Sequence, residues 1–454
     1  MLNRLLFSRI EAWIVVLLAL LAILGAIAFG ALVLAGTQRP PRFGALAQGA
    51  KAVASIPFTV EKLLEADKQL QAITADRFIG QPSGWTVDPA FAGKIGGYLL
   101  LSRFDGIEKR HVVELVSLRD MATVHAWKPD AEALLADVAR TSQLAQYDLW
   151  FNETWRAIHP FLMETGDLII KDHQSPLFRI DACSGHVWTQ DRMMFHHSTN
   201  SDGEGGFWIP SLYEPQTVEG TTQETYEDGS AHVSAEGEVL WKRSMLQVFL
   251  DHGLEHRLFP PSQMNQDPTH MNDIEPVLAD GPYWKKGDLF ISFRRLSMVI
   301  LYRPSTDQIV WMKDGPWMAQ HDVDIVDSTR IAVFDNAAYD RGRGGYVRDY
   351  TRIAVYDFAT DTVSYPYAAA MEKAETKTLY EGLSDLMPGG LAMVEEENAG
   401  RILIVGQNGE IAASYLNMGD GGLTYRLGWS RYIDQATGDA VAAKLAATSC
   451  PAGG

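Results

Sequence analysis

Residues 287–311 read GDLFISFRRLSMVILYRPSTDQIVW, and this stretch shows a pattern that recurs along the chain. A glycine opens a short apolar strand, a second apolar strand follows, and after a polar turn a third strand ends on Trp311. β-Branched and aromatic residues favour strands, and Pro, Ser and Asp favour turns. The stretch therefore predicts three successive short strands.

The same pattern recurs from residue 96 onward. Six copies close on an aromatic residue, four clear ones followed by two weaker ones: Trp127, Trp188, Trp241, Trp311, Tyr365 and Tyr415. The closing residues are separated by 61, 53, 70, 54 and 50 residues, which leaves room for a four-stranded blade and its loops. Near-regular spacing favours radial repetition over stacked β-sandwiches, because each sheet can bury its faces against similar neighbours. We predict an all-β fold, a six-bladed β-propeller.

The repeats also set the limits of this propeller. We predict that it covers residues 90–435 and that the segment 423–433 supplies the strand that closes the ring. The segments 130–144 and 367–386 contain Ala, Leu and Glu where strands would carry β-branched residues, and they predict helical insertions outside the blades. Residues 436–454 are expected to form a C-terminal tail.

Residues 12–36 contain no charged side chain. At about 1.5 Å per residue, a helix of this length exceeds the roughly 30 Å hydrocarbon core of a bilayer. Because a cleaved signal peptide usually has only about 7–15 apolar residues, the segment predicts a retained transmembrane anchor rather than a signal cleaved near residues 45–47. A short tail, residues 1–11, precedes the anchor. A linker and a stalk helix, the latter over residues 60–73, are expected within residues 37–89.

The orientation of the anchor is inferred from the lengths of its flanks. Basic residues lie on both sides of the span, so the positive-inside rule does not decide the topology. The short N-terminal tail favours transport of the large C-terminal part. We therefore predict a single-pass protein of the bacterial inner membrane with its main domain in the periplasm. The anchor also offers a contact surface for a membrane protein partner.

Charge and cysteine content exclude several classes of protein. The formal net charge is -18 and the pI is near 5.1, and without a cluster of Lys and Arg the sequence predicts no nucleic-acid partner. Only two cysteines occur, Cys183 and Cys450, which excludes a disulfide-dense scaffold. These two residues either form one bridge between distant parts of the chain or remain unrelated thiols.

Three histidine-bearing segments fall between the predicted blades. They are residues 195–198 (FHHS), 267–272 (DPTHMN) and 320–324 (QHDVD), and Arg294 follows a strand in the sequence Ser292-Phe293-Arg294. Loops from all blades of a propeller converge on one central mouth. Residues that are far apart in the sequence can therefore meet there.

These elements carry a resemblance to a known family. The ordered set D-x-x-H-x-N, then S-x-R, then Q-H-D-V-D before a strand ending in Phe334-Asp335-Asn336, resembles the arylsulfotransferase family over roughly residues 150–420. The resemblance implies transfer of a sulfuryl group from a phenolic sulfate ester to a phenolic acceptor. It further implies no nucleotide sulfate donor, no cofactor, and an enzyme that is transiently sulfurylated on histidine.

The resemblance also implies roles for individual residues. His321 would be the nucleophile, His270 would lie beside it, and Arg294 would bind the sulfate oxygens. From the doublet at positions 196 and 197 we choose His197 as a further donor. The residues expected to contact substrate around this group are Asn272, His196, Gln320, Asn336 and Arg352.

The residue types suit this chemistry. A neutral imidazole is a competent nucleophile near pH 7, and a covalent intermediate divides one difficult displacement into two easier ones. The fork of Arg294 can pair two sulfate oxygens and offset the repulsion of an anion by an acidic protein. Well-studied bacterial members of the family carry a short-range disulfide close to the active site. This sequence has no two cysteines near each other and departs from the family in that respect.

Two alternatives remain open at this stage. The first is a zinc site built from His196, His197, His270 and His321, although no short H-x-x-x-H or cysteine spacing supports it; we predict no metal. The second is a propeller without catalytic activity that binds a membrane partner, since a fold does not determine a function. Convergence of the histidines and Arg294 in space would favour the enzyme.

Overall fold

The computed structural model describes residues 11–36, 42–69, 72–74, 76–145, 147, 150–261, 265–342, 344–419 and 422–450. The chain divides into two compact units, residues 1–70 and residues 71–454, and each is described by itself. Most of the expected N-terminal tail, residues 1–11, lies outside the described residues.

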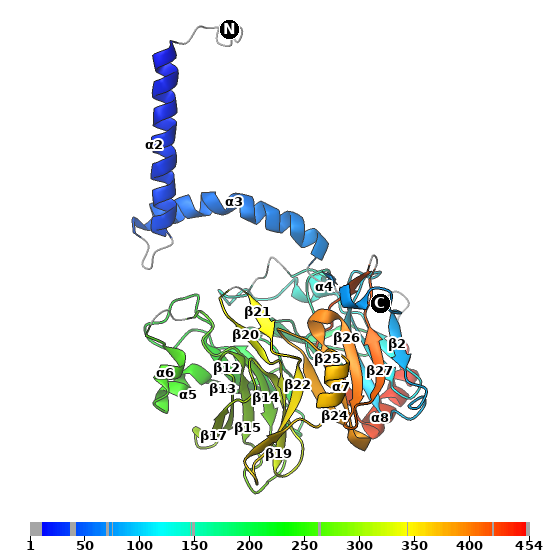
Figure 1. The fold of residues 1–454 in the computed structure, drawn as a ribbon. Helices are drawn as coiled ribbons and strands as arrows, with labels where there is room; N and C mark the ends of the chain where they lie inside the picture. The colour runs from blue at the N-terminus through cyan, green and yellow to red at the C-terminus, as the bar shows by residue number, and fades with distance from the viewer. Residues whose placement is uncertain are drawn as a thin grey trace. The chain divides into compact units, whose positions relative to one another are not determined.

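The first unit contains two helices, α2 (Ala12–Gly36) and α3 (Gly44–Gln69) (Figure 1). Helix α2 is apolar on all sides, and its large side chains are exposed, as is Trp13 at 63%. Among the described residues it is the only helix long and apolar enough to cross a membrane. Helix α3 begins well before the expected stalk helix, inside the segment interpreted as a spacer, and strand β1 (Ala72–Thr74) follows it.

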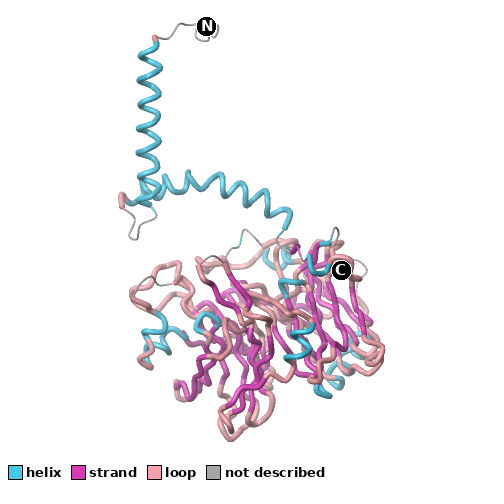
Figure 2. Tube along the Cα trace, viewed as in Figure 1, coloured by secondary structure: helices cyan, strands magenta, loops and turns pink. Residues whose placement is uncertain are grey.

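The second unit is mostly β-structure in a propeller-like arrangement, with short helices between the strands (Figure 2). Four of its sheets are blades of four or five antiparallel strands. The first blade is β29-β3-β4-β5, with bounds Arg431–Ile433, Tyr98–Asp105, Arg110–Ser117 and Ala122–Trp127. Because β29 comes from the end of the chain and pairs with β3, the segment expected to close the ring does join the first blade.

Three further blades follow the same plan. One consists of β14 (Met271–Pro276), β15 (Leu289–Phe293), β16 (Met298–Arg303) and β17 (Gln308–Asp314). The next consists of β18 (His321–Ile325), β19 (Arg330–Asp335), β22 (Arg352–Asp357) and β23 (Thr362–Ser364). The five-stranded blade consists of β24 (Leu383–Met387), β25 (Leu391–Glu396), β26 (Arg401–Gly406), β27 (Ile411–Leu416) and β2 (Gly84–Val87).

The remaining large sheet has eight strands. Its members are β6 (Phe161–Leu162), β7 (Leu168–Ile170), β8 (Ser175–Ile180), β9 (His186–Phe195), β10 (Asn200–Ser201), β11 (Phe207–Leu212), β12 (Asp228–Val233) and β13 (Val239–Ser244). Two small pairs lie outside the blades: β1 with β28 (Leu423–Tyr425), and β20 (Ala338–Asp340) with β21 (Gly345–Val347).

The core lies between neighbouring sheets. In one cluster Leu301 of β16, Val333 of β19 and Tyr356 of β22 pack together, all nearly inaccessible to solvent. Burial of each large apolar side chain contributes about 1.5–3 kcal/mol. Because most blade strands are covered on both faces, they appear in the sequence as apolar runs rather than as a strict alternation.

Hydrogen bonds join the inner edge strands of the sheets. Three carboxylates each accept a backbone N–H from the next sheet: Asp273 from Val323 (2.8 Å), Asp322 from Ser384 (2.9 Å) and Asp385 from Tyr432 (2.7 Å). Arg431 donates to the carbonyl of Thr199 at 2.6 Å, and Asn200 donates to Asp273 at 3.1 Å. These contacts form a closed circuit through β14, β18, β24, β29 and the segment of β10, which we call the carboxylate ring.

The helical insertions are shorter than the sequence predicts. Helix α4 (Ala131–Leu135) and helix α7 (Ala368–Lys373) begin at the expected places but end early, and residues 383–387 form strand β24 instead of helix. Helix α7 ends before Glu375, which has φ 50°, and β24 follows a turn at Gly382, which has φ 87° and where a Cβ would lie 2.7 Å from the Phe334 ring. Two more short helices, α5 (Met245–Asp251) and α6 (Glu255–Leu258), follow β13.

Part of the expected C-terminal tail is ordered as helix α8 (Gln435–Ala447). Its Val441 and Leu445 are buried in one cluster with Trp127. Beyond the helix, Cys450 forms a disulfide with Cys183, with a Cα–Cα distance of 5.3 Å. The bridge closes 267 residues of sequence and holds the helix against the blades.

We expect loss of this disulfide to lower stability. Substitution Cys183→Ser should reduce the free energy of unfolding by about 2–5 kcal/mol, because the bridge restricts the unfolded chain. Urea unfolding of the full chain in detergent measures the change. The double variant with Cys450→Ser should be no less stable than either single variant, since both remove the same bond. Two alkylatable thiols in the non-reduced wild type would contradict the pairing.

Candidate active site

Three histidines from distant segments gather at the inner edges of the blades. His197 follows β9, His270 precedes β14, and His321 opens β18. The ring of His197 lies 5.2 Å from that of His270 and 6.3 Å from that of His321. His197 and His270 have φ of 53° and 50°, a left-handed conformation that ordinary residues adopt mainly where the surroundings impose it. We call these residues the three-histidine cluster.

Hydrogen bonds fix the tautomer of His321, which is 1% exposed. Its Nδ1 lies 2.8 Å from Oδ1 of Asn336, whose own Nδ2 donates to the carbonyl of Glu381 at 2.8 Å. The amide nitrogen is therefore committed, and Oδ1 must accept a proton from Nδ1. Nε2 accepts the backbone N–H of Glu381 at 3.1 Å. The lone pair of His321 is consequently on Nε2.

Burial keeps the imidazole of His321 neutral. It lowers the pKa of His321 well below the usual value, the charge of Arg294 lowers it further, and the bond with Asn336 acts weakly in the other direction. Burial lowers the pKa of His197 in the same way, and the surrounding histidines add to the effect. Both imidazoles are therefore neutral at pH 7, with one nitrogen unprotonated, which is the state that a nitrogen nucleophile needs.

His270 is the most accessible member of the cluster, with 27% of its side chain exposed. Its Nδ1 donates a short hydrogen bond to the carboxylate of Asp267, and its backbone N–H donates to the same carboxylate at 2.9 Å. Although burial would raise the pKa of Asp267, the bond from His270 holds it below the usual value. This pairing leaves Nε2 of His270 available for proton transfer.

His197 is held from two directions. Its Nδ1 lies 2.8 Å from Nδ1 of His196, whose Nε2 is 3.5 Å from a carboxylate oxygen of Asp228. The ammonium group of the fully buried Lys171 donates to the carbonyl of His197, and burial lowers the pKa of that lysine well below its usual value. The ring of His173 lies 4.4 Å away. The contact between the two Nδ1 atoms thus orients the ring of His197.

Arg294 lies beside the cluster on the 3-10 turn η3 (Arg294–Leu296), directly after β15. Its backbone N–H donates to the carbonyl of His270 at 3.0 Å, which ties the turn to the histidine segment. The guanidinium lies 5.1 Å from the ring of Tyr380, and one nitrogen donates to the Leu379 carbonyl at 3.4 Å. Within the described part of the chain, its buried Nε has no partner. The group is positioned but not neutralised.

The other expected substrate residues have partners within the protein. Asn272 donates to the carbonyl of Gln320 at 2.8 Å, and Gln320 donates to Ser292 and Met298 at 3.1 and 2.9 Å. Both side chains are fully buried. Arg352 donates to Asp335 at 3.0 Å and lies over Tyr365. The structure thus brings the histidines and Arg294 together. The side chains of Asn272, Gln320, Asn336 and Arg352 are instead hydrogen-bonded to other parts of the protein.

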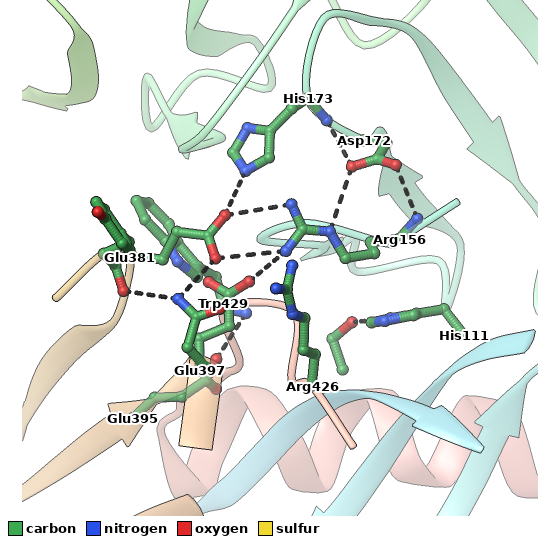
Figure 3. A network of polar contacts seen from close by, with 12 residues as sticks. His111, Arg156, Asp172, His173, Glu381, Glu395, Glu397, Arg426 and Trp429 are labelled. Carbon is green, nitrogen blue, oxygen red and sulfur yellow. Dashed lines mark hydrogen bonds and ion pairs between the residues drawn. The ribbon is translucent and has the colours of Figure 1, made fainter. Parts of the chain in front are cut away.

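A network of charges around Glu381 was not expected from the sequence (Figure 3). Arg156 donates to Glu397 at 2.6 Å and to Glu381 at 3.2 Å, and His173 lies 3.0 Å from the same carboxylate of Glu381. Although burial acts to raise the pKa of Glu381, Arg156 holds it well below its usual value. The network anchors the residue whose backbone N–H bonds to His321.

Trp429 is the second feature that sequence reasoning missed. Its ring lies 5.7 Å from that of His197 and 5.9 Å from that of His321, in edge-to-face contacts with both. Its backbone N–H donates to Glu395 at 2.8 Å. In the sequence it was indistinguishable from the tryptophans that pack between blades, because only the fold places it beside histidines.

The cluster also has the composition of a metal site. One nitrogen from each of His197, His270 and His321 lies within 4.8 Å of the others, and imidazole is a common zinc ligand. His321 nevertheless uses Nδ1 toward Asn336 and Nε2 toward Glu381. A metal on Nε2, like any other partner of this nitrogen, would have to displace the Glu381 N–H.

The fold and the site together define a propeller-like protein with neutral histidines and an arginine at the inner edges of its blades. The family model for arylsulfotransferase (ASST) matches residues 161–417. This is more than half of the chain, and the protein belongs to that family. No curated protein matches the chain.

Several solved structures resemble the chain at low identity. A protein of unknown function from Bacteroides caccae is 10% identical over 74% of this chain and 99% of its own, with a TM-score of 0.46. A nidogen/laminin complex is 9% identical over 75% and 99%, with a TM-score of 0.41. A virginiamycin B lyase from Staphylococcus aureus is 10% identical over 58% and 85%, with a TM-score of 0.34.

The neutral state of His321 predicts a pH dependence of stability. Its folded pKa lies below that of the unfolded chain, about 6.5, so below that pH the unfolded state binds the extra proton. The free energy of unfolding should therefore fall as pH drops from 7 to 5.5. Substitution His321→Asn should reduce the slope by at most about 1.4 kcal/mol per pH unit, the limit for one proton. Urea titrations measure both slopes, and equal slopes would contradict a buried neutral imidazole.

Proposed function

We propose that this protein transfers a sulfuryl group from a phenolic sulfate ester to a phenolic acceptor through a sulfohistidine at His321. The observation that supports this most strongly is the convergence of a buried, neutral His321 with His197, His270 and Arg294. In this proposal the sulfate comes from an aryl ester, and no nucleotide donor is used. Membership of the arylsulfotransferase family supports the reaction class.

In the first half of the reaction Nε2 of His321 attacks the sulfur atom. The N–S bond forms, the bond from sulfur to the phenolic oxygen breaks, and the phenolate leaves. The hydrogen bond that Nε2 accepts from the backbone N–H of Glu381 must break first. The proton stays on Nδ1, and the hydrogen bond that it donates to Oδ1 of Asn336 stabilises the positive charge of the sulfated imidazolium. In the second half an acceptor phenol attacks sulfur, and the N–S electron pair returns to Nε2.

Arg294 and the other histidines carry the charge and the protons. We assign Arg294 to the non-bridging sulfate oxygens, because its guanidinium has a buried nitrogen without a partner among the described residues. His270, whose Nδ1–H is held by Asp267, enters the reaction as the imidazolium: its Nε2–H protonates the leaving phenolate, and the neutral Nε2 then takes the proton of the acceptor phenol. His197 donates to the sulfuryl group beside it. Proton transfer of this kind contributes about 100- to 10,000-fold in rate.

The remaining expected site residues receive supporting roles in this proposal. Asn336 fixes the tautomer of His321, while Asn272 and Gln320 connect the segments that carry His270 and His321. His196 orients His197. Arg352 forms an ion pair with Asp335, which directly precedes Asn336, and so helps to hold Asn336 in place.

We further propose that the fold is a six-bladed propeller spanning the catalytic domain 90–435. The eight-stranded sheet joins β6–β9 to β10–β13 through only two residue pairs, Phe195 with Ser211 and Met194 with Leu212. Each half then counts as one blade beside the four separate ones. Strand β9 reaches both halves because it is ten residues long.

The proposed location is the bacterial inner membrane, with α2 as a single-pass anchor and the main domain in the periplasm. The disulfide between Cys183 and Cys450 supports an oxidising compartment. The exposed apolar surface of α2 supports contact with lipid, and it also offers a surface to a membrane protein partner. The competing function is a non-catalytic scaffold, which gives no reason for a neutral histidine beside an unneutralised arginine.

Substitution His321→Asn tests the nucleophile. The variant should fold normally but lose turnover of 4-nitrophenyl sulfate with phenol, since an amide cannot form the intermediate. Mass spectrometry of wild type treated with donor alone should show an adduct of about 80 Da on His321, as a covalent mechanism requires. The exposed His186→Asn is the matched control and should retain full activity. Normal turnover in His321→Asn would end the proposal.

Substitution Arg294→Lys tests the sulfate contact. Lysine keeps the charge but loses the planar fork that pairs two oxygens. We expect the donor KM to rise about tenfold, the equivalent of one strong hydrogen bond, while the adduct on His321 still forms. Steady-state kinetics with varied donor measure the effect, with Arg119→Lys as the control. A donor KM equal to that of wild type would exclude Arg294 from sulfate binding.

A further inference from the structure

Arg294, whose backbone N–H bonds to His270, also lines a pocket of about 450 Å³. Its wall includes two arginines, two tyrosines and two apolar side chains: Arg294, Arg295, Tyr339, Tyr380, Met318 and Leu379. Its size falls within the roughly 300–1,000 Å³ of small-ligand sites. Because Arg294 belongs both to this pocket and to the surroundings of His321, the pocket is where the aromatic part of a substrate would lie.

The second arginine of the pocket is not used by the sulfuryl transfer described above. Arg295 follows Arg294 on the turn η3, and its backbone N–H donates to the carbonyl of Thr269 at 3.1 Å. Its side chain is exposed. Among the described residues, no hydrogen bond or ion pair engages its guanidinium. A chain with a net charge of -18 thus places two adjacent cations at one small pocket.

The one acidic residue in the wall, Asp340 at the end of β20, forms no ion pair with either arginine among the described residues and accepts the backbone N–H of Gly342 within its own turn. The charge of Asp267 acts on both arginines, but this carboxylate is hydrogen-bonded to His270. Like charges at close range are unfavourable unless an anion separates them. A ligand with two negative groups would relieve the repulsion between the two arginines, since each guanidinium would then face an anion. A sulfate ester without a further substituent supplies only one such group.

We propose that the preferred substrates are phenols that carry an anionic substituent, such as a carboxylate, attached to the aromatic ring, together with the sulfate esters of these phenols. Arg295 is the partner of this anionic substituent. The inference rests on the proposed function. In a double-displacement reaction, the aryl group of the donor and that of the acceptor occupy the same pocket in turn. Arg294 holds the sulfuryl group near His321, the tyrosines contact the ring, and Arg295 binds the distal anion.

A matched pair of ligands tests this assignment. We compare 4-hydroxyphenylacetate with 4-hydroxyphenylacetamide, whose phenol groups are chemically alike because a methylene separates them from the substituent. Calorimetry on the full chain in detergent measures binding of each without donor. Wild type should prefer the carboxylate by roughly three- to tenfold, as expected for a partly exposed charge-assisted hydrogen bond. Arg295→Gln should abolish the preference, and Arg295→Lys should restore part of it.

The control variant Arg119→Gln removes the same charge from an exposed position outside the pocket and should keep the preference. Equal affinities for the two ligands in wild type would overturn the proposal. So would an equal loss of affinity for both in Arg295→Gln, which would place Arg295 on the phenol or ring.

The sulfate esters of the two phenols then test turnover. A binding preference without turnover would retain the pocket assignment and refute the sulfotransferase. Turnover without a binding preference would retain the sulfotransferase and refute the assignment of the pocket. An equal fall in kcat/KM for both esters in Arg295→Gln would show that both arginines hold the same sulfuryl group, which contradicts the proposal.

Discussion

The site depends on the carboxylate ring that links the inner edge strands. Asp322 directly follows His321, and Asp273 lies three residues after His270, so the same short strands carry both the ring and the cluster. Burial raises the pKa of Asp273 to about 6, even though several hydrogen bonds and Arg431 act against it. Its contacts to backbone N–H groups therefore stabilise the charged form and, with it, the approach of the blades.

Burial explains why histidine suits the chemistry at this position. A solvated imidazole would be partly protonated near pH 6.5, but His321 and His197 are kept neutral by desolvation and by nearby positive charge. The site therefore separates its charges. Positive charge lies at Arg294 where an anion would bind, and negative charge lies at Glu381, where Arg156 and His173 hold it. An acidic protein can in this way admit an anionic substrate.

The repeated strands could be predicted because each copy carries its own local pattern, as the segment 287–311 does. Strand β24 could not be predicted where a helix was expected, because the turn at Gly382 before it packs against Phe334 from another blade. The ordered histidine motifs pointed to residues that the structure brings together, whereas their final spacing depends on blade packing. Trp429 and the network around Glu381 carried no motif, because their partners come from distant segments.

In the proposed reaction His321 becomes covalently sulfurylated before any acceptor binds. Rapid mixing of the full chain with 4-nitrophenyl sulfate in the absence of acceptor tests this step most directly. We predict a burst of about one equivalent of 4-nitrophenol per active site, followed by slow release. If no nitrophenol appears until a phenol is added, transfer passes directly between the two substrates, and the covalent mechanism is wrong.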